Sequence, residues 1–567
     1  MNNIFIQLAV ILTFSSALGL VVYKLKLPLL IAYLITGLLL SAAATFDISK
    51  SLALSFLPDI GIAFVLFLVG MELDLRELRS FGKQILTAGI LQVIITGTLG
   101  TYIAQSFGFN TREAIYMGVG LSFSSTLVVV KLLLDRKDLT SLYGKLSVGV
   151  LLLEDLIAVV ILLGFSSSLS ISSLGIANLL PLSLFAVKVI ALFSLAVFIN
   201  RFILSAVFKA VSDSGELLFL TALAWCFGFI TLSVLMGFSI MIGAFLAGVA
   251  LASSPYHFQI QGKIKPMRDF FTALFFVYLG TKVSFPSNLS IYPLILIFSF
   301  YAVVAKPVIF LLLFGIFGFR KHTMFRTAIN LSQVSEFSMI ILLMGFKMGI
   351  VSQSALTVIA LSSVTSFIAS SLMISRSEKI YKFISSGVGF FERKRSPVLE
   401  KEPDARLEDH VVIVGAHRVG GEIARFLRKE RSPLVVLDFN PHQVETLLKQ
   451  EIPVIYGDMS DPDVLDVLNL DEARMIISTA PDLEGNKTLL EDLKLRKINI
   501  PVIVRAETVK DAKALYKRGA DLVIIPEVMA GDMLLDTLKD HLNEKSYFKD
   551  RPRIELEKLS RKTLAWG

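Results

Sequence analysis

The sequence predicts a multi-pass α-helical membrane domain followed by a soluble α/β domain. Of the 567 residues, 54% are hydrophobic and only 18% are charged, whereas soluble domains carry roughly 25% charged residues. The deficit is confined to a series of apolar segments that ends near Ser375, and the sequence after Arg376 has ordinary charge. We therefore expect a membrane domain over residues 1–375, a linker over 376–409, a soluble domain over 410–540 and a short tail over 541–567.

The apolar segments have the length of membrane helices, which need about 20 apolar residues. The eighth and ninth share one nearly continuous run, which we divide near Gly237, and the eleventh is long enough to be tilted or to begin with a loop. The first segment lacks the basic start and small-residue exit of a signal peptide. Thirteen spans are predicted, at about 4–23, 28–45, 53–72, 84–106, 113–134, 146–167, 179–200, 215–234, 236–254, 267–283, 289–318, 325–347 and 353–375.

The distribution of basic residues orients these spans. Sixteen Lys and Arg residues fall in one set of alternate loops and four in the other, and the richer set is expected on the cytoplasmic side. The N-terminus is then outside and the soluble domain is cytoplasmic, in a protein of the cell (inner) membrane. This pattern accounts for the net charge of +8 without nucleic-acid binding. The single cysteine, Cys226, excludes an intramolecular disulfide and a cysteine zinc site.

Ionisable residues lie deep inside the sixth and eleventh predicted spans, where charge is costly and usually functional. Glu154 and Asp155 are adjacent in the sixth span, so they point about 100° apart on a helix, and one can face a cavity while the other faces a neighbouring helix. A desolvated carboxylate can exchange a proton near neutral pH. Lys306, in the eleventh span, calls for a carboxylate partner, either Asp155 or Glu154, and Pro307 loosens the helix beside it. The alternative for the two carboxylates is a structural hydrogen bond between helices. The alternative for Lys306 is a side chain that extends to the membrane–water interface.

Two further spans contain polar patches that are typical of helices unwound near the middle of the membrane. The fifth span holds Ser124, Ser125 and Thr126, and the twelfth holds Gln333 and Glu336. Secondary transporters with inverted repeats place ion sites where broken helices of the two halves cross. Ordinary polar packing between helices is the alternative.

These residues and three apolar motifs resemble the Kef-type branch of the monovalent cation:proton antiporter family. The motifs are Phe64–Asp74, Gly243–Gly248 and Met267–Phe276, and Ser332–Phe337 is similar to the family's Ser-Gln-Gly-Gly-Glu-Phe. The resemblance implies thirteen helices, an inverted-repeat core, an elevator-like cycle and a homodimer, with Asp155 as the essential ion-binding residue. The preceding position is Gln in Kef-type relatives and Asp in electrogenic sodium/proton antiporters. Because this position is Glu154 here, the sequence does not decide whether the cation is potassium or sodium. It also does not decide whether the exchange is electroneutral or electrogenic.

The soluble domain begins with a Rossmann-type pattern. A strand over 410–414 leads into Gly415–Gly421 and a helix, and a second strand over 434–437 ends in Asp438. Phosphate is expected at the helix start and ribose at the acidic residue. His417 occupies the second glycine position, where a side chain could weaken dinucleotide binding or select a smaller nucleotide. The candidate ligand-binding residues are Gly415, His417, Arg418, Val419, Gly420 and Asp438.

This domain resembles the N-terminal RCK, or Trk-type, regulatory domains of potassium channels and transporters. The similarity extends through Tyr456–Asp458, Thr479–Asp482 and Gly519–Asp521, and adds Asp458 to the candidates. Such domains dimerise and bind NAD(H), AMP or related nucleotides. We expect NAD(H) or AMP as a regulatory ligand, with a Rossmann scaffold that binds nothing as the alternative.

The leading function is therefore exchange of potassium or sodium for protons across the lipid bilayer, with no cofactor required for transport and no enzymatic activity. A nucleotide-gated potassium channel is the alternative, but the sequence has no Thr-Val-Gly-Tyr-Gly filter. A third interpretation, an NAD-dependent membrane oxidoreductase, lacks an acid/base cluster to accompany the nucleotide fold.

Overall fold

The chain divides into two compact units in a computed structural model. One comprises Met1–Leu132, Leu146–Phe317 and Met324–Phe391, and is helical; the other holds Glu392–Gly567 and two short segments, Leu133–Lys145 and Gly318–Thr323. The structure describes residues 4–25, 27–42, 57–72, 82–136, 138–139, 141–166, 204–211, 214–252, 254, 256–283, 291–392, 407–459 and 462–542, with scattered residues in 191–202 and 544–556.

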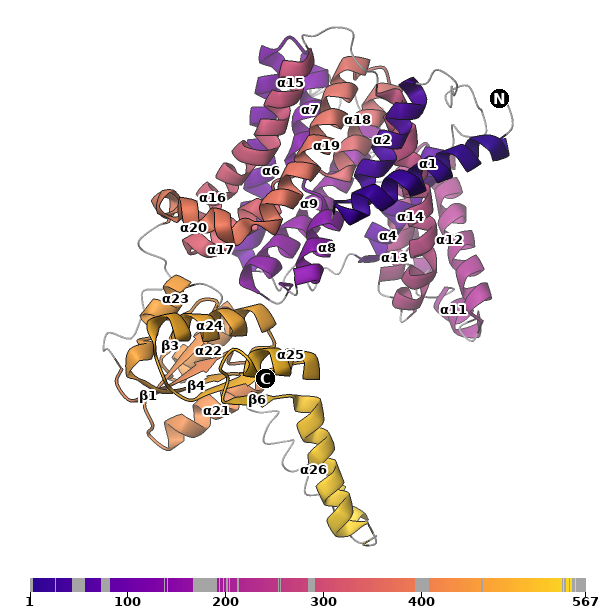
Figure 1. The fold of residues 1–567 in the computed structure, drawn as a ribbon. Helices are drawn as coiled ribbons and strands as arrows, with labels where there is room; N and C mark the ends of the chain where they lie inside the picture. The colour runs from indigo at the N-terminus through magenta and orange to yellow at the C-terminus, as the bar shows by residue number, and fades with distance from the viewer. Residues whose placement is uncertain are drawn as a thin grey trace. The chain divides into compact units, whose positions relative to one another are not determined.

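The described helices of the first unit form two packed groups (Figure 1). In the first group, α1 (Ile4–Lys24), α2 (Leu29–Ala42), α4 (Leu57–Glu72), α11 (Ser205–Val211), α12 (Gly215–Leu235), α13 (Ile240–Ala252) and α14 (His257–Lys282) pack together. The second contains α6 (Gly82–Ser106), α7 (Thr111–Ser122), α8 (Thr126–Arg136), α9 (Leu142–Ser166), α15 (Ile291–Phe300), α16 (Lys306–Ile316), α17 (Lys321–Asn330), α18 (Glu336–Lys347) and α19 (Gln353–Ser375).

Glycines allow the helices of the first group to touch through their backbones. A Cβ atom at Gly248 of α13 would lie 2.1 Å from the carbonyl oxygen of Phe67 in α4, and one at Gly37 of α2 would lie 2.0 Å from that of Val277 in α14. Small residues at such crossings are typical of membrane helix pairs, which associate through close van der Waals contact. The first group is therefore a tightly packed body.

The predicted breaks in the fifth and twelfth spans are confirmed. The helix of the fifth span is interrupted at Phe123–Ser125, between α7 and α8, and that of the twelfth span at residues 331–335, between α17 and α18. In the eleventh span the helix continues, but Tyr301–Ala305 forms a π-helical turn directly before Lys306 and Pro307. A proline lacks the N–H that an α-helix needs at this point, so the local widening has a direct cause.

Other boundaries agree in part. Gly237, with φ of 85°, separates α12 from α13 as predicted. The seventh span, 179–200, lies mostly outside the described residues. The segment 376–409 is not simply a linker, because α20 (Ser377–Val388) and a 3₁₀ turn, Gly389–Phe391, occupy its beginning. This helix is amphipathic and buries Tyr381 and Val388, a pattern that the charged residues between them obscure in the sequence.

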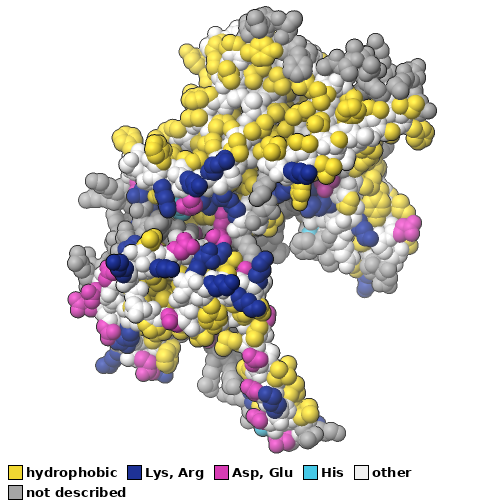
Figure 2. All heavy atoms as spheres, in the orientation of Figure 1, with side chains coloured by type: hydrophobic (Ala, Val, Ile, Leu, Met, Phe, Trp, Pro, Cys, Tyr) yellow, Lys and Arg dark blue, Asp and Glu magenta, His cyan; other side chains and the backbone are white. Residues whose placement is uncertain are grey.

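Among the described residues, five helices are long and apolar enough to cross a membrane. They are Phe5–Lys24, Gln84–Ser106, Gly215–Leu235, Ile291–Ile316 and Gln353–Ser375, and three shorter apolar helices accompany them. The visible face of this unit is covered mainly by hydrophobic side chains (Figure 2), and large apolar residues such as Leu296 and Phe300 are more than half exposed. Such a surface is stable when lipid covers it.

The second unit contains a parallel six-stranded sheet with the order β3-β2-β1-β4-β5-β6. This is the Rossmann order, as predicted. Val412 pairs with Val435 on one side and with Ile476 on the other, so β1 lies at the centre. The strands are β1 (His410–Val414), β2 (Leu434–Asp438), β3 (Val454–Tyr456), β4 (Ala473–Ser478), β5 (Val502–Arg505) and β6 (Leu522–Ile524). The helices are α21 (Arg418–Lys429), α22 (Pro441–Lys449), α23 (Pro462–Val467), α24 (Leu483–Arg496), α25 (Val509–Tyr516) and α26 (Pro526–His541).

Candidate ion-binding site and nucleotide-binding edge

The two interrupted helices are hydrogen-bonded to each other at their breaks. Ser124 donates from Oγ to the carbonyl oxygen of Leu331 at 3.1 Å, and Gln333 donates from Nε2 to that of Ser125 at 3.4 Å. Ser370 of α19 donates to Gln333 Oε1 at 2.6 Å. Unwinding frees backbone groups that need polar partners inside an apolar unit. The serines and the glutamine of the two patches supply them.

Glu154 is fully buried at this crossing. The backbone N–H of Ser124 donates to Glu154 Oε2 at 2.5 Å, and the Ser124 hydroxyl lies 3.4 Å from Oε1. Lys306, also fully buried, is the cation whose charge acts on Glu154, and its Nζ donates to the carbonyl oxygen of Gln333 at 3.3 Å. Of the two carboxylates considered for Lys306, Glu154 is thus its electrostatic neighbour. Buried opposite charges stabilise one another where water cannot.

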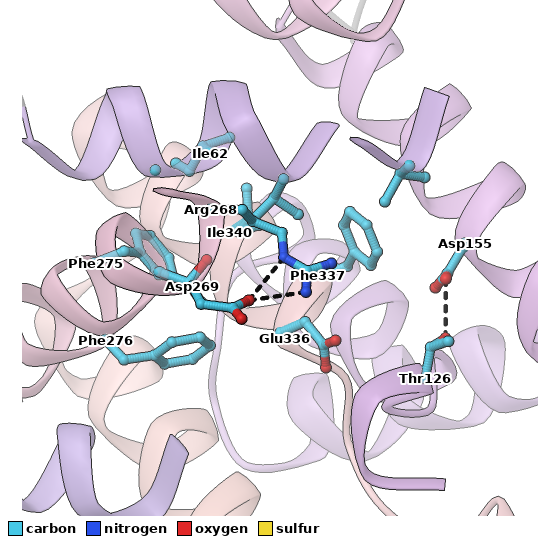
Figure 3. Close-up of a pocket in the computed structure, with 14 residues that line it drawn as sticks. Ile62, Thr126, Asp155, Arg268, Asp269, Phe275, Phe276, Glu336, Phe337 and Ile340 are labelled. Atoms are coloured by element: carbon cyan, nitrogen blue, oxygen red, sulfur yellow. Dashed lines mark hydrogen bonds and ion pairs between the residues drawn. The ribbon is translucent and has the colours of Figure 1, made fainter. Parts of the chain in front are cut away.

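Asp155 faces a cavity, as the angular separation of the two carboxylates predicts. Thr126, at the start of α8, donates from Oγ1 to Asp155 Oδ2 at 2.9 Å. About 630 Å³ of space that protein atoms do not fill lies here, which includes space open to solvent. Its polar lining residues are Thr126, Asp155, Arg268, Asp269, Thr272 and Glu336, and the rest of its wall is apolar or glycine. Figure 3 shows Asp155 and Thr126 at one side of this space, with Glu336 between them and Arg268.

The cavity lies between the two helix groups. One wall comes from α4 and α14, and the other comes from Thr126 of α8, Asp155 of α9 and the start of α18. Asp155 and Glu336 are each 7% exposed, so both carboxyls can be reached from the cavity while being largely removed from solvent. Carboxylate, hydroxyl and carbonyl oxygens are the ligands that hard cations prefer, and a carboxylate can hold a proton in place of a cation.

The structure brings together all eight residues predicted for the ion site: Glu154, Asp155, Lys306, Ser124, Ser125, Thr126, Gln333 and Glu336. Sequence reasoning missed Arg268 and Asp269 of α14, which line the cavity, and Ser370, which binds Gln333. An adjacent pair of opposite charges at the start of an apolar span was the available signal for the first two. A serine among several in α19 offered none.

The carboxyl edge of the sheet has the geometry of a nucleotide-binding loop. Gly415 has φ of 82°, which only glycine adopts without strain. A Cβ atom at Gly420 would lie 1.8 Å from the carbonyl oxygen of Gly415, so this position also requires glycine for the helix to approach the loop. Thr479 Oγ1 donates to the same oxygen at 2.8 Å. These contacts fix the turn between β1 and α21.

Asp438, at the end of β2, is bound to that turn. Its Oδ2 accepts from the N–H of Ala416 at 2.6 Å and its Oδ1 from that of Asn440 at 2.7 Å. Burial raises the pKa of Asp438, and the two backbone N–H groups act in the opposite direction. A carboxylate has about four acceptor positions, so two positions are left for ribose hydroxyls.

The other predicted residues are arranged around the same edge. His417 immediately precedes α21 and its side chain does not cap the helix. Arg418 begins α21, and Val419 is 59% exposed. Asp458 is buried just after β3, the strand that pairs with β2. The predicted residues thus lie around the turn between β1 and α21 and just after the ends of β2 and β3.

Comparisons with known proteins decide the family. Residues 9–376 match the model of the transmembrane sodium/hydrogen exchanger family, and residues 411–526 match that of the TrkA-N domain. The chain belongs to the sodium/hydrogen exchanger family. It is 28% identical over 537 residues, covering 94% of this chain and 81% of the relative, to a protein of Alkalimonas amylolytica named as a K(+) efflux antiporter, KefB.

Another curated relative also matches most of this exchanger, and a solved structure matches its membrane part. The exchanger is 27% identical over 525 residues to the glutathione-regulated potassium-efflux system protein KefC of Klebsiella pneumoniae, covering 92% of this chain and 82% of that protein. Among solved structures, the sodium proton antiporter MjNhaP1 from Methanocaldococcus jannaschii is 14% identical, with a TM-score of 0.48, over 66% of this chain and 96% of that one. The exchanger is thus a cation/proton antiporter with a C-terminal TrkA-N domain, and its named relatives are transporters, in agreement with the expectation that it is not an enzyme.

Proposed function

We propose that this antiporter exchanges potassium, or sodium, for protons, and that Asp155 holds the cation and the proton in turn. The observation that carries the proposal is the position of Asp155: it lies at the crossing of two interrupted helices, bonded to Thr126, and faces a cavity between two helix groups. A metal cation and a proton compete for this single carboxylate, which can bind only one of them at a time. This competition couples their movement in opposite directions.

Movement of one helix group against the other would give the site alternating access. The group that contains α8, α9 and α18 carries the ion-binding side chains, while α4 and α14 form the facing wall. The group that contains α4 and α14 has backbone-to-backbone helix crossings, which suit a fixed scaffold. An elevator-like shift of the ion-binding group past this scaffold would expose Asp155 first on one side of the membrane and then on the other.

Potassium is the preferred cation in this proposal. Relatives that match most of the chain are named as potassium-efflux proteins. The choice between potassium and sodium still has to be measured, because Glu154 differs from the Gln of Kef-type relatives and adds, with Lys306, buried charges near the site. Sodium is the other outcome to be measured. The orientation with the TrkA-N domain in the cytoplasm follows from the basic loops.

Nucleotide binding to the TrkA-N domain is proposed to regulate the exchange. The loop at Gly415–Gly420 and the carboxylate of Asp438 have the geometry for phosphate and ribose, and NAD(H) and AMP are the candidates. Homodimerisation is supported by α26, which buries no residue and exposes Met529, Met533 and Leu534 among others. An apolar helix face of this kind is stable when another subunit covers it.

Proton flux in proteoliposomes tests the transport proposal. The purified chain is reconstituted with an internal pH dye, and potassium or sodium is added outside. We expect cation-dependent proton movement from the wild type, and none from Asp155→Asn, whose side chain can hold neither a charge nor a labile proton. Glu216→Gln is the control, because Glu216 is an exposed carboxylate at the start of α12. Normal exchange by Asp155→Asn would contradict the assignment of the site.

A further inference from the structure

The cavity that leads to Asp155 contains a fixed positive charge. Arg268 of α14 lines it together with three carboxyl side chains, Asp155, Asp269 and Glu336. The Arg268 side chain is 11% exposed, and its guanidinium is protonated at any pH that the protein meets. A cation on its way to Asp155 therefore enters a space that already holds a cation of the protein.

Arg268 is held by its neighbour in the sequence. Its Nε and Nη2 both donate to the same oxygen, Oδ1 of Asp269, at 3.0 and 2.8 Å. This leaves part of the guanidinium fork unused, whereas the strongest arginine–carboxylate pairs use two oxygens. Asp269 is 59% exposed, and pairs with exposed partners contribute little to stability. The arrangement is therefore easily exchanged for another.

Alternative partners for the guanidinium lie across the same space. In Figure 3 the Arg268 side chain of α14 extends into the cavity, the Glu336 carboxyl group lies between it and Asp155, and Asp155 lies at the far side. Both carboxyls are 7% exposed, so an ionised state without a counter-charge is unfavourable there. When neither a metal cation nor a proton is bound, the guanidinium, which lines the same cavity, can act as a counter-charge.

We propose that Arg268 is a built-in competitor of the transported cation, and that Asp269 holds Arg268 away from the ion-binding carboxylates. This inference rests on the proposed exchange at Asp155. The cation must displace the guanidinium, which then returns to Asp269. Asp269 thus sets the apparent affinity for the cation without touching it, and Arg268 prevents the site from standing empty and ionised in the cavity.

The test is a set of cation titrations of proton flux by the full chain in proteoliposomes, with potassium chloride and sodium chloride as the probes. Asp269→Asn is expected to raise the half-saturating cation concentration by about tenfold, because the lost carboxylate no longer competes for the guanidinium. The maximal rate should change much less. Arg268→Gln should lower the half-saturating concentration, and the double variant should behave as Arg268→Gln does.

Two variants serve as controls. Lys265→Gln removes a positive charge from an exposed position of α14 one turn away and should leave the titration unchanged. Asp269→Glu retains the carboxylate, and its half-saturating cation concentration should stay close to that of the wild type. If Asp269→Asn does not fold, the titrations of Asp269→Glu and Arg268→Gln test the proposal.

The inference is overturned if Asp269→Asn shifts the titration equally with and without Arg268, or if Arg268→Gln leaves the half-saturating concentration unchanged. Absence of cation-dependent flux in the wild type would instead remove the proposed exchange itself. The two failures are therefore distinguishable.

Discussion

At the scale of single residues, the site depends on two buried charges that are separate from the cavity. Glu154 and Lys306 are both fully buried, and the carboxylate also accepts from the N–H of Ser124. Removing one member of such a pair leaves the other uncompensated and costs about 3–5 kcal/mol. The pair can therefore stabilise the crossing of the broken helices and, in the same way, influence the charge on Asp155 beside it.

Lys306→Gln should lower the thermal stability of the purified protein and shift the pH dependence of exchange, because Glu154 loses its counter-charge and must take up a proton. Glu154→Gln with Lys306→Gln should recover most of the stability, since no isolated charge is left. Thermal unfolding in detergent and flux titrations between pH 6 and pH 9 measure the two effects. If Lys306→Gln changes neither, the lysine has no electrostatic role.

At the scale of helices, the sequence predicted the breaks but not every boundary. Ser124 and Gln333 indicated unwinding because polar residues in an apolar run need partners, and those partners are present. The start of α14 at His257 and the helix α20 were missed. Both segments contain charged residues, so a search for continuous apolar runs does not include them. The structure nevertheless continues as a helix through these charged positions.

The ion site was predictable for a similar reason. Glu154, Asp155 and Lys306 stand out since charge is rare inside apolar segments. Arg268 and Asp269 lie where a span is expected to begin, and charges there are ordinary. Only the packing of α14 against α4 shows that these two side chains line the same cavity as Asp155. The choice of Glu154 as the neighbour of Lys306 likewise required the fold.

The close crossing of α4 and α13 leads to a stability prediction with opposite signs at two glycines. Gly248→Ala places a Cβ atom 2.1 Å from the carbonyl oxygen of Phe67, and we expect a loss of about 1–3 kcal/mol because the helices must separate. Gly228→Ala in α12 has no atom within 4 Å of the new Cβ. It should be neutral or stabilising by about 0.5–1 kcal/mol, because alanine favours the helix.

Thermal unfolding of the two alanine variants in the same detergent gives the comparison. A destabilised Gly248→Ala beside an unchanged or stabilised Gly228→Ala supports the close crossing. Equal stability of the two variants would mean that α4 and α13 do not approach through their backbones at this point.

At the scale of the whole molecule, the chain combines a membrane exchanger with a Rossmann sheet that has its own hydrophobic core. The composition change near Ser375 indicated two parts, although the first compact unit extends to Phe391. The strand–glycine–helix pattern with Asp438 predicted the order of the sheet. The identity of the ligand could not be predicted in the same way. The loop conformation of Gly415 and the bond from Ala416 to Asp438 suit any nucleotide that has a phosphate and a ribose.

The last prediction concerns energetic coupling between the two parts. A ligand can regulate transport only if it binds two states of the protein with different affinity, and the effect is then reciprocal. Calorimetry on a fragment from Asp404 onward, titrated with AMP, ATP, NAD and NADH, should identify the nucleotide. Asp438→Ala should abolish its binding, because the ribose contact and the bond to Ala416 are both lost, whereas Asp471→Ala, an exposed carboxylate after β3, should not.

In the full chain, the nucleotide so identified should change the rate of exchange, and saturating potassium should change the affinity for that nucleotide. Coupling energies between sites are typically about 1–3 kcal/mol, which corresponds to affinity changes of about 5- to 150-fold. If the nucleotide binds but neither effect is observed, the domain is not a regulator of transport under those conditions. If no nucleotide binds with better than millimolar affinity, the sheet serves as a structural or dimerising module, and the regulatory part of the proposed function is wrong.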